Sequence, residues 1–314
     1  MFENLVRQLG EALQADDALS AYLLVDPMLR EPFSEDLLQA EPRETWTVPV
    51  RHPLLKPEQR PRLIRLHPHD THLLKASLAL ALSEQADPDA EGEQGFVLGG
   101  WLLTDAPADA LARHFARCMQ GGFPGETNPK FIRWADRRVI EWMWPVLTPN
   151  QQAGLLGPVH CWYSLDRCGE LVRYEAPSDA KQEGVGFSAD QWAHATRNEA
   201  VQDLLRGWLR FAGALPSDYL QRASEATAAT ISAGLSNRQD RVLLGAYILQ
   251  VHPQLTTHPT VHSLIARALR GDATLAQALE GVPDPEGWNT IRTELERHVG
   301  LSQLQPATQG ERLG

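Results

Sequence analysis

The run His67-Pro68-His69-Asp70-Thr71-His72 contains residue types that could bind a metal ion. Two imidazoles at i and i+2, a carboxylate and a third imidazole are ligand types that zinc accepts, and zinc can activate a water molecule for hydrolysis. The run also lies at a predicted strand-to-helix turn, where Asp70 or Thr71 would cap the helix. No companion motif such as HExxH is present in the sequence. We therefore favour the capping role, and a metal-dependent hydrolase that uses His67, His69 and His72 is the alternative.

A second set of charged residues surrounds another predicted strand-to-helix corner: Arg133, Asp136, Arg137 and Arg138. Cations gathered around one carboxylate, beside large aromatic side chains, predict either a partly desolvated ion-pair network or a site that binds an anion. A small-anion-binding regulatory module is therefore a further alternative. We favour a structural network that fixes the corner, because perturbed ion pairs are as often architectural as functional.

The remaining residues that could do chemistry form no recognisable catalytic motif. Cys118, Cys161 and Cys168 show no CxxC spacing, so we expect free, largely buried thiols. The sequence contains no GxSxG elbow, no P-loop and no GxGxxG motif. We therefore predict a protein that is not an enzyme and that requires neither a cofactor nor a metal.

The composition is that of an ordinary globular protein: 314 residues, of which 43% are hydrophobic and 22% charged. The formal net charge of −11 argues against a general nucleic-acid binder, which needs a basic surface to neutralise phosphates. The first residues predict an amphipathic helix and no signal peptide. The longest apolar run, Leu73–Leu82, is well short of the ~18 residues that a membrane span needs. We expect a soluble, cytoplasmic protein that contacts neither nucleic acid nor membrane.

The charged corner belongs to the stretch that organises the chain, residues 131–163. Alternating apolar residues predict a strand over Phe131–Trp134, and Asp136 is the expected N-cap of an amphipathic helix that follows it. Prolines then interrupt the helix, a short second helix follows, and Gly157-Pro158 opens another strand. Trp142 and Trp144 lie two apart on the first helix, which is apolar over much of its circumference. We expect this helix to be buried rather than to present an apolar patch to a partner.

The N-terminal half alternates strand and helix patterns, which predicts an α+β lobe: a mixed β-sheet with helices packed on it. The acidic stretch Glu84–Gly95 is predicted to be a solvated loop. In Phe96–Leu103, a strong strand, the pair Gly99-Gly100 indicates a bulge or a close approach of another backbone segment. The other strands are expected at 22–25, 46–50, 62–66, 159–165 and 170–174, and the other helices at 2–15, 71–83 and 106–119.

No convincing strand follows Tyr174, so the sequence predicts an all-helical C-terminal lobe. Its helices are expected at 188–211, 216–233, 237–251, 260–270, 273–279 and 285–299. The loop 177–186 is the candidate boundary. The predicted organisation is therefore an α/β lobe over residues 1–177, a helical lobe over 178–304 and a disordered tail over 305–314.

At this point the organising stretch resembles a known family. The segment Arg133-Trp134-Ala135-Asp136-Arg137-Arg138-Val139-Ile140 is similar to the Arg-aromatic-aromatic-Asp-Pro-Arg-Val-Leu signature of the type VI secretion effector adaptors, also called effector chaperones. Leu155–Val159 followed by Trp162 resembles the family's Gly-Pro-Val…Trp strand. The likeness covers most of the chain and is most specific over 133–162. Arg137 stands in place of the usual proline and Ala135 in place of the second aromatic residue.

The resemblance implies a function in binding. Such adaptors stay in the producing bacterium, hold a toxic type VI effector, often by its N-terminal region, and bring it to the tail of a VgrG-type spike protein. They are not known to catalyse a reaction. The residues that the resemblance brings forward, as partner-binding groups or as the framework of a structural corner, are Arg133, Trp134, Asp136, Arg138, Trp142 and Trp162. A junction between two lobes is the place where we expect a partner segment to bind.

Overall fold

The computed structural model describes residues 2–34, 43–53, 55–122, 130–182 and 184–303. The chain divides into two compact units, Met1–Asn198 and Glu199–Gly314. The first holds a β-sheet with helices, and the regular elements described in the second are all helices, which confirms the predicted α+β class. The units divide later than the boundary expected at 177/178, because the segment that includes α8 (Ala189–Ala195) packs on the first unit. The predicted tail, 305–314, lies outside the described residues.

The first unit is built on a six-stranded sheet with the order β2-β3-β1-β4-β7-β8. Every pairing in this sheet is antiparallel, so the expectation of a mixed sheet is wrong. Alternating strand and helix patterns cannot distinguish the two arrangements when the connections are long enough for either. The strands are β1 (Ser20–Val25), β2 (Thr45–Thr47), β3 (Arg62–Leu66), β4 (Leu98–Thr104), β7 (Val159–Leu165) and β8 (Leu171–Tyr174).

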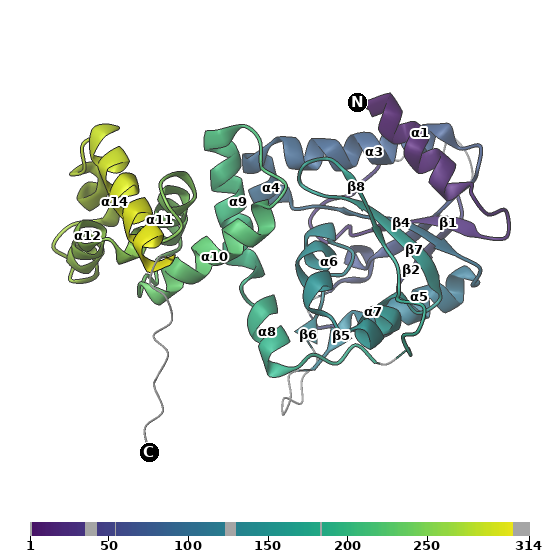
Figure 1. The fold of residues 1–314 in the computed structure, drawn as a ribbon. Coiled ribbons are helices and arrows are strands. Elements are labelled where there is room, and N and C mark those ends of the chain that lie inside the picture. The colour runs from purple at the N-terminus through teal and green to yellow at the C-terminus, as the bar shows by residue number, and fades with distance from the viewer. Residues whose placement is uncertain (1, 35–42, 54, 123–129, 183, 304–314) are drawn as a thin grey trace, which may run out of the picture. The chain divides into compact units, whose positions relative to one another are not determined.

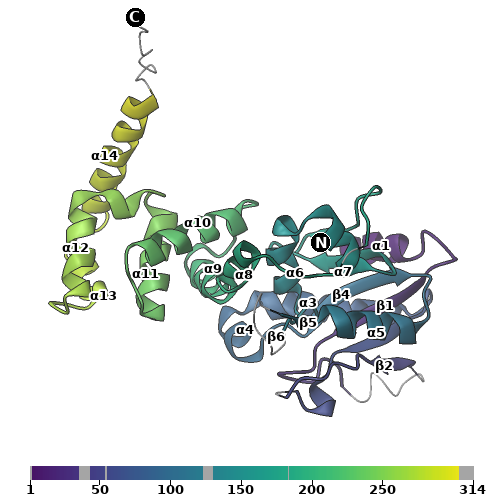
Figure 2. The same ribbon diagram turned by 90° about the horizontal axis from the view of Figure 1, so that it is seen from below.

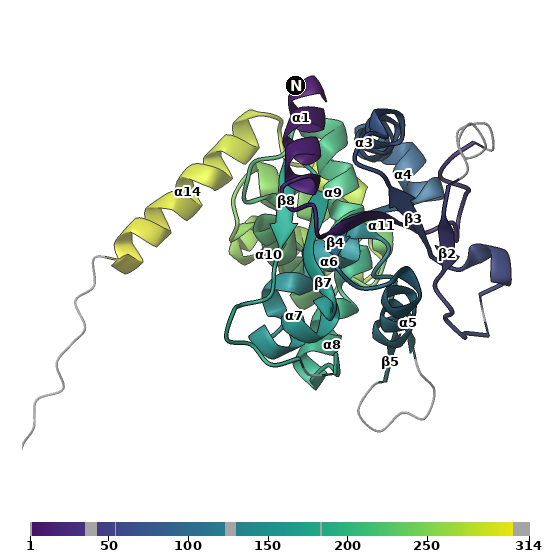
Figure 3. The same cartoon turned by 90° about the vertical axis from the view of Figure 1, so that its right-hand side faces the viewer.

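Helices cover both faces of this sheet (Figures 1 and 3). Leucines of α1 (Phe2–Leu13) and α3 (Thr71–Ala86) share one apolar cluster with Leu23, Ile64 and Trp101 of the strands. The opposite face is covered by α5 (Ala108–Cys118) and α7 (Pro149–Leu156). There Phe115 packs edge-on against Trp162, at 5.6 Å between ring centroids. The two faces follow from the strict alternation of side chains along each strand.

The pair Gly99-Gly100 confirms the expected bulge. The register between β1 and β4 shifts at this point, with Leu24 opposite Gly100 and Val25 opposite Leu98. A Cβ atom on Gly99 would lie 2.7 Å from the carbonyl oxygen of Ala135, so the corner segment can approach the strand only because no side chain is present. Gly100 has φ +135°, a conformation that other residues rarely adopt.

Two local predictions in this unit are wrong. The expected strand Phe131–Trp134 is reduced to β6 (Lys130–Phe131), which pairs with β5 (Gln120–Gly121) in a second, two-stranded sheet. The acidic stretch Glu84–Gly95 is helical: α3 extends to Ala86, and α4 (Pro88–Gln94) follows it. Asp87 caps α4 and Pro88 occupies its first turn, which is a favoured start for a helix.

The second unit begins with α9 (Asn198–Ala212), so the single helix expected over 188–211 is in fact α8 and α9. Within this unit α10 and α11 lie side by side (Figure 2). The half-buried Tyr247 packs against the buried Trp288, at 4.6 Å between ring centroids. The remaining helices agree with the predicted ranges to within a few residues: α10 (Tyr219–Ser232), α11 (Arg238–Gln250), α12 (Pro259–Leu269), α13 (Leu275–Glu280) and α14 (Glu286–Gln303). Across the described residues of both units, no helix has the length and apolar character that a membrane span requires.

Candidate functional site

The charged corner is organised by Asp136, which is the N-cap of α6 (Arg137–Met143), as predicted. Its Oδ1 accepts a hydrogen bond from the backbone N–H of Arg138 at 3.1 Å and a second from Nε of the same residue at 2.9 Å. Its Oδ2 accepts from Nη2 of Arg138 at 2.6 Å. One carboxylate thus caps the helix and holds an arginine of the first turn in a bidentate pair.

Arg133 joins this pair to the end of β1. Its Nε donates to Oδ2 of Asp26 at 2.9 Å, and its Nη1 lies 3.7 Å from Oδ2 of Asp136. Asp26 is fully buried, and it also accepts from the backbone N–H of Met28 at 3.0 Å. Burial raises the pKa of Asp26, although the neighbouring charge of Arg133 opposes this effect. Arg133 therefore connects the corner to the end of β1, a central strand of the sheet.

Arg137 points in the opposite direction, into the protein. Its guanidinium forms an ion pair with Glu84 of α3, donates to the carbonyl oxygen of Ala81 at 2.6 Å and donates to that of Leu98 at 3.3 Å. Glu84 also accepts from the backbone N–H of Val97 at 2.7 Å. Both charged side chains are almost completely buried, and burial raises the pKa of Glu84. This pair connects α6, α3 and the start of β4.

A fourth carboxylate, Glu91 of α4, accepts from two arginines. Arg167, in the turn between β7 and β8, donates to it twice, at 2.8 and 2.6 Å. Arg138 donates to it at 2.7 Å. Burial alone would raise the pKa of Glu91, but the hydrogen bonds and charges of the two arginines lower it below its ordinary value. Glu91 therefore stays ionised and ties the hairpin to the corner.

Phe96 lies at the centre of these ion pairs. Its ring is 1% exposed, and the guanidinium carbons of Arg137, Arg138 and Arg167 lie 3.9, 4.6 and 5.5 Å from its centroid. Cations over an aromatic face are attracted by its quadrupole, and the ring keeps water away from the ion pairs. Arg30 adds a further partner, because its Nη2 lies 3.2 Å from Oε1 of Glu84. We call the whole set the arginine corner: Asp26, Arg30, Glu84, Glu91, Phe96, Arg133, Asp136, Arg137, Arg138 and Arg167.

The carboxylates of the arginine corner find their partners within the same unit. Burial alone would raise the pKa of Asp136, but the charges of Arg138 and Arg133 and the hydrogen bonds of Arg138 lower it to about 2. Each carboxylate of the arginine corner thus has at least one arginine partner. Among the three arginines of segment 133–140, Arg133 has the most exposed side chain, at 22%. The geometry therefore favours the structural interpretation over an anion site.

The tryptophans of the predicted site are buried, and each donates its indole N–H to a backbone carbonyl. Trp134 donates to Cys118 and Trp162 to Gly99, at 2.9 and 3.0 Å. Trp142 donates to the carbonyl of His194 at 2.9 Å and stacks on its ring, with 3.9 Å between centroids. Burial of α6 was the expected outcome. The contact between Trp142 and His194 holds α8 against α6. The structure thus brings Arg133, Asp136 and Arg138 together and places the tryptophans in separate contacts.

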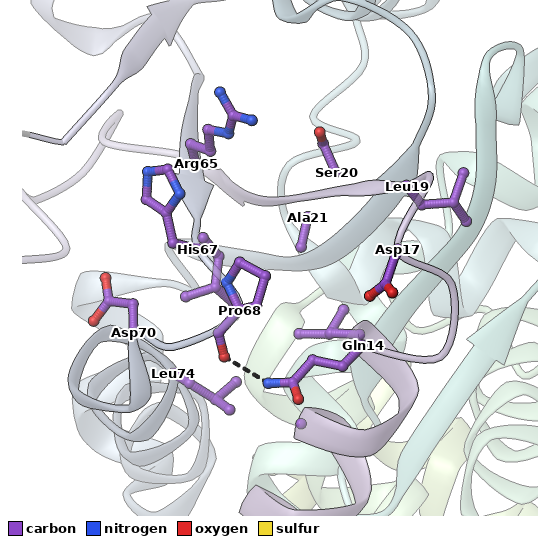
Figure 4. Close-up of a pocket in the computed structure, with 13 residues that line it drawn as sticks. Gln14, Asp17, Leu19, Ser20, Ala21, Arg65, His67, Pro68, Asp70 and Leu74 are labelled. Atoms are coloured by element: carbon purple, nitrogen blue, oxygen red, sulfur yellow. Dashed lines mark hydrogen bonds between the residues drawn. The ribbon is translucent and has the colours of Figure 1, made fainter.

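The histidine run has the predicted capping role. The carboxylate of Asp70 accepts from the backbone N–H of Leu73 at 2.9 Å at the start of α3, and it also pairs with Arg43. Among the described residues, which include His67, His69 and His72, no group of three His, Cys, Asp or Glu side chains is placed to hold a metal ion. His67 instead lines a cavity of about 180 Å³, together with Asp17, Ser20 and Arg65. Gln14 also lines this cavity and donates a hydrogen bond to the carbonyl oxygen of Pro68 (Figure 4).

Sequence reasoning missed several residues of the arginine corner. Glu84 and Glu91 stand seven residues apart in the stretch that was expected to be a solvated loop, and Arg167 lies in a turn far from the signature segment. The Asp87-Pro88 pair was the available signal, because a cap followed by proline predicts a helix start. A predicted helix here would have allowed one face, and with it the two glutamates, to pack against the rest of the unit.

The fold and the corner together define an antiparallel sheet, covered by helices on both faces, in which a strand-to-helix motif is anchored by buried ion pairs. Residues 21–154, from β1 to α7 of this unit, match the family model of a domain of unknown function, DUF4123. The match spans less than half of the chain and includes the segment 133–140. No curated protein and no solved structure gives a match.

Proposed function

We propose that this protein is a type VI secretion effector adaptor, which binds an effector and a VgrG-type spike protein inside the producing cell. The proposal rests on one observation: the signature-like segment 133–140 lies within the region that matches the domain family model. In the structure this segment carries the helix cap and the ion pairs that organise the first unit. The protein would act by binding, and it would keep the effector in a state that is ready for export.

The experiment is affinity purification of the tagged, full-length protein from its own host, followed by mass spectrometry of the proteins that accompany it. We expect recovery of a spike protein together with a large toxin-like chain. Reconstitution of the three purified proteins, followed by size-exclusion chromatography, would then test whether one adaptor binds both partners at once. Recovery of neither partner under conditions in which the secretion system is produced would contradict the proposal.

Arg133→Ala is the variant that separates a structural from a recognition role of the corner. The Arg133 side chain is 22% exposed, so it could contact a partner while it remains paired with Asp26. A lowered melting temperature with partner binding retained below that temperature would assign Arg133 to the fold. An unchanged melting temperature with loss of one partner would assign it to recognition. Arg113→Ala, an exposed arginine on α5, serves as the matched control.

A further inference from the structure

The outer strand β8 leaves one edge of the large sheet without a described neighbour. The sheet ends with β8, which pairs with β7 through Leu171 opposite Leu165 and Tyr174 opposite Trp162 (Figure 1). An edge strand of this kind presents free N–H and C=O groups, to which another extended chain can add. The opposite edge differs, since β2 spans only Thr45–Thr47.

The direction of the free backbone groups follows from the turn. The backbone N–H of Asp166 donates to the carbonyl of Glu170 at 3.0 Å, at the first position of the hairpin. In an antiparallel ladder, hydrogen-bonded and non-hydrogen-bonded pairs alternate. Continuing this alternation directs the groups of Val172 toward β7, and it directs those of Leu171 and Arg173 away from the sheet. These two residues would therefore form the first bonds to an added strand.

The side chains of β8 are suited to contact an added strand that is apolar in its centre. Leu171 and Val172 lie on opposite faces of the sheet and are each only half-buried, whereas Tyr174 is buried against Trp144. Neighbouring apolar side chains on an added strand would cover the exposed parts of both, as cross-strand pairs do. The hairpin carries no proline and no register shift that would block such an addition.

Charges at the ends of β8 indicate what the added strand carries. Glu170 and Glu175 are exposed and stand directly before and after the strand, and Asp166 lies in the adjoining turn. Arg173 pairs with Glu175, and its Nε donates to the sulfur of Cys161 at 3.2 Å, so it offsets one of these three acids and leaves the edge negatively charged. An incoming strand with Lys or Arg near its ends would complement this acidic edge.

A second copy of this chain is the other strand that could add here. Because the backbone groups of Leu171 and Arg173 face outward and those of Val172 do not, a twofold antiparallel pairing must be centred on a residue. Centred on Arg173, it places the two Arg173 side chains opposite each other, and like charges in this position are destabilising. Centred on Val172, it places Glu170 opposite Tyr174, so the acid gains no cation. The edge therefore fits a basic-flanked strand from a different protein better than its own copy.

We propose that β8 binds an extended segment of a partner protein, apolar in its centre and flanked by lysine or arginine, as an additional strand of the sheet. The inference deepens the proposed adaptor function, which would make the effector or the spike protein the owner of that segment. The binding step itself can be tested without either partner, so its failure is distinguishable from a failure of the adaptor function.

The test is a selection of displayed random peptides of about ten residues, enough to cover a strand of ~5–6 residues, on the full-length protein. We expect enriched peptides with alternating apolar residues and basic flanks. Their affinity, measured by fluorescence anisotropy, should fall at least about tenfold for Arg173→Pro, which removes the outward N–H together with the side chain. It should change little for Arg173→Ala, which removes the side chain alone. Val172→Pro removes an N–H that faces β7 and should lower the melting temperature, which checks the assigned direction.

Hydrogen exchange of the wild-type protein, with and without the best peptide, provides the second measurement. We expect slower exchange at β8 in the complex, and this result does not depend on whether a proline variant folds. The proposal is overturned if no peptide is enriched, if Arg173→Pro binds as well as Arg173→Ala, or if protection appears elsewhere in the chain. A concentration-dependent dimer that Arg173→Pro dissociates would instead assign the edge to a second copy.

Discussion

Arg137→Pro would put into this chain the residue that the adaptor signature usually has at that position, and we expect it to be strongly destabilising. Proline is well suited to the first turn of a helix, so the backbone of α6 should accept it. The change removes, however, the guanidinium that pairs with Glu84, whose carboxylate is fully buried. Glu84 would then keep Arg30, whose side chain is 28% exposed, as its remaining arginine partner.

The magnitude follows from the cost of breaking a buried ion pair. Removing one partner of such a pair costs about 3–5 kcal/mol, because the other charge stays buried. For a unit of this size, each kcal/mol lowers the melting temperature by roughly 2–4 °C, so a fall of about 6–20 °C is expected. Thermal unfolding followed by circular dichroism measures this shift, and urea unfolding gives the corresponding change in free energy.

The pH dependence provides an independent check on the cause. Burial already raises the pKa of Glu84 above its ordinary 4.5, and loss of Arg137 would raise it further. An acid whose folded pKa is raised contributes stability below its unfolded pKa and loses it as the pH rises through the folded value. The deficit of Arg137→Pro should therefore be smaller at pH 5 than at pH 8. The double variant Glu84→Gln/Arg137→Pro should recover much of the loss, since no buried charge remains. A single variant that unfolds within about 1 °C of the wild type, or a double variant that is no better, would refute the reasoning.

The other predictions concern the same unit. Asp136→Ala should lower stability by about 1–2 kcal/mol through the lost cap alone, and more through the unpaired arginines, as measured by urea unfolding. Because the pKa of Asp136 is lowered to about 2, the wild type should lose this contribution as the pH falls from 4 to 2, and an Asp136→Asn variant should show a flatter acid profile. Glu141 lies on α6, and burial raises its pKa from the ordinary 4.5 to about 7, so Glu141→Gln should remove a loss of stability that the wild type shows as the pH rises from about 5 to 7. Gly100→Ala should prevent folding or lower the melting temperature markedly, since its Cβ would clash with the carbonyl oxygen of Tyr163; a normal melting curve would contradict this. Cys118, whose pKa burial raises to about 12, should resist alkylation at pH 8 until urea unfolds the protein, and rapid labelling of the folded chain would be the contrary result.

Local patterns predicted the elements of this fold more reliably than their surroundings. Asp136 and Asp70 were recognisable as caps because a cap depends on the residue itself and on the few that follow it. The bulge at Gly99 was also visible, since glycine within an apolar strand has few other causes. The antiparallel order of the sheet was not predictable, because strand pairing depends on contacts between segments far apart in the sequence.

The charged groups show most clearly which features the sequence could not predict. An acidic stretch with few apolar residues normally faces solvent. The Asp87-Pro88 pair indicates that a helix starts there, but nothing local shows that Glu84 and Glu91, rather than their exposed neighbours, are the buried acids. Their burial depends on Arg137, Arg138 and Arg167, which are 47 to 76 residues away along the chain. The arginines indicated that a carboxylate network exists, but the sequence identified only Asp136 as a member of it.

The location of the signature-like segment in the structure bears on what a family signature can say about binding. Trp134, Asp136 and Arg137 are buried, and their polar atoms are directed to groups of the same unit. A motif of this kind is constrained by the fold, so it can be shared by adaptors that bind quite different effectors. Specificity for one partner is then expected on surfaces where side chains can change without unpairing a buried charge, and the edge of β8 is such a surface. Exchanging Leu171 and Val172 for other apolar or polar residues should therefore alter which peptides bind while the melting temperature stays within a few degrees. Exchanges within the arginine corner should lower the melting temperature and leave unchanged which peptides bind.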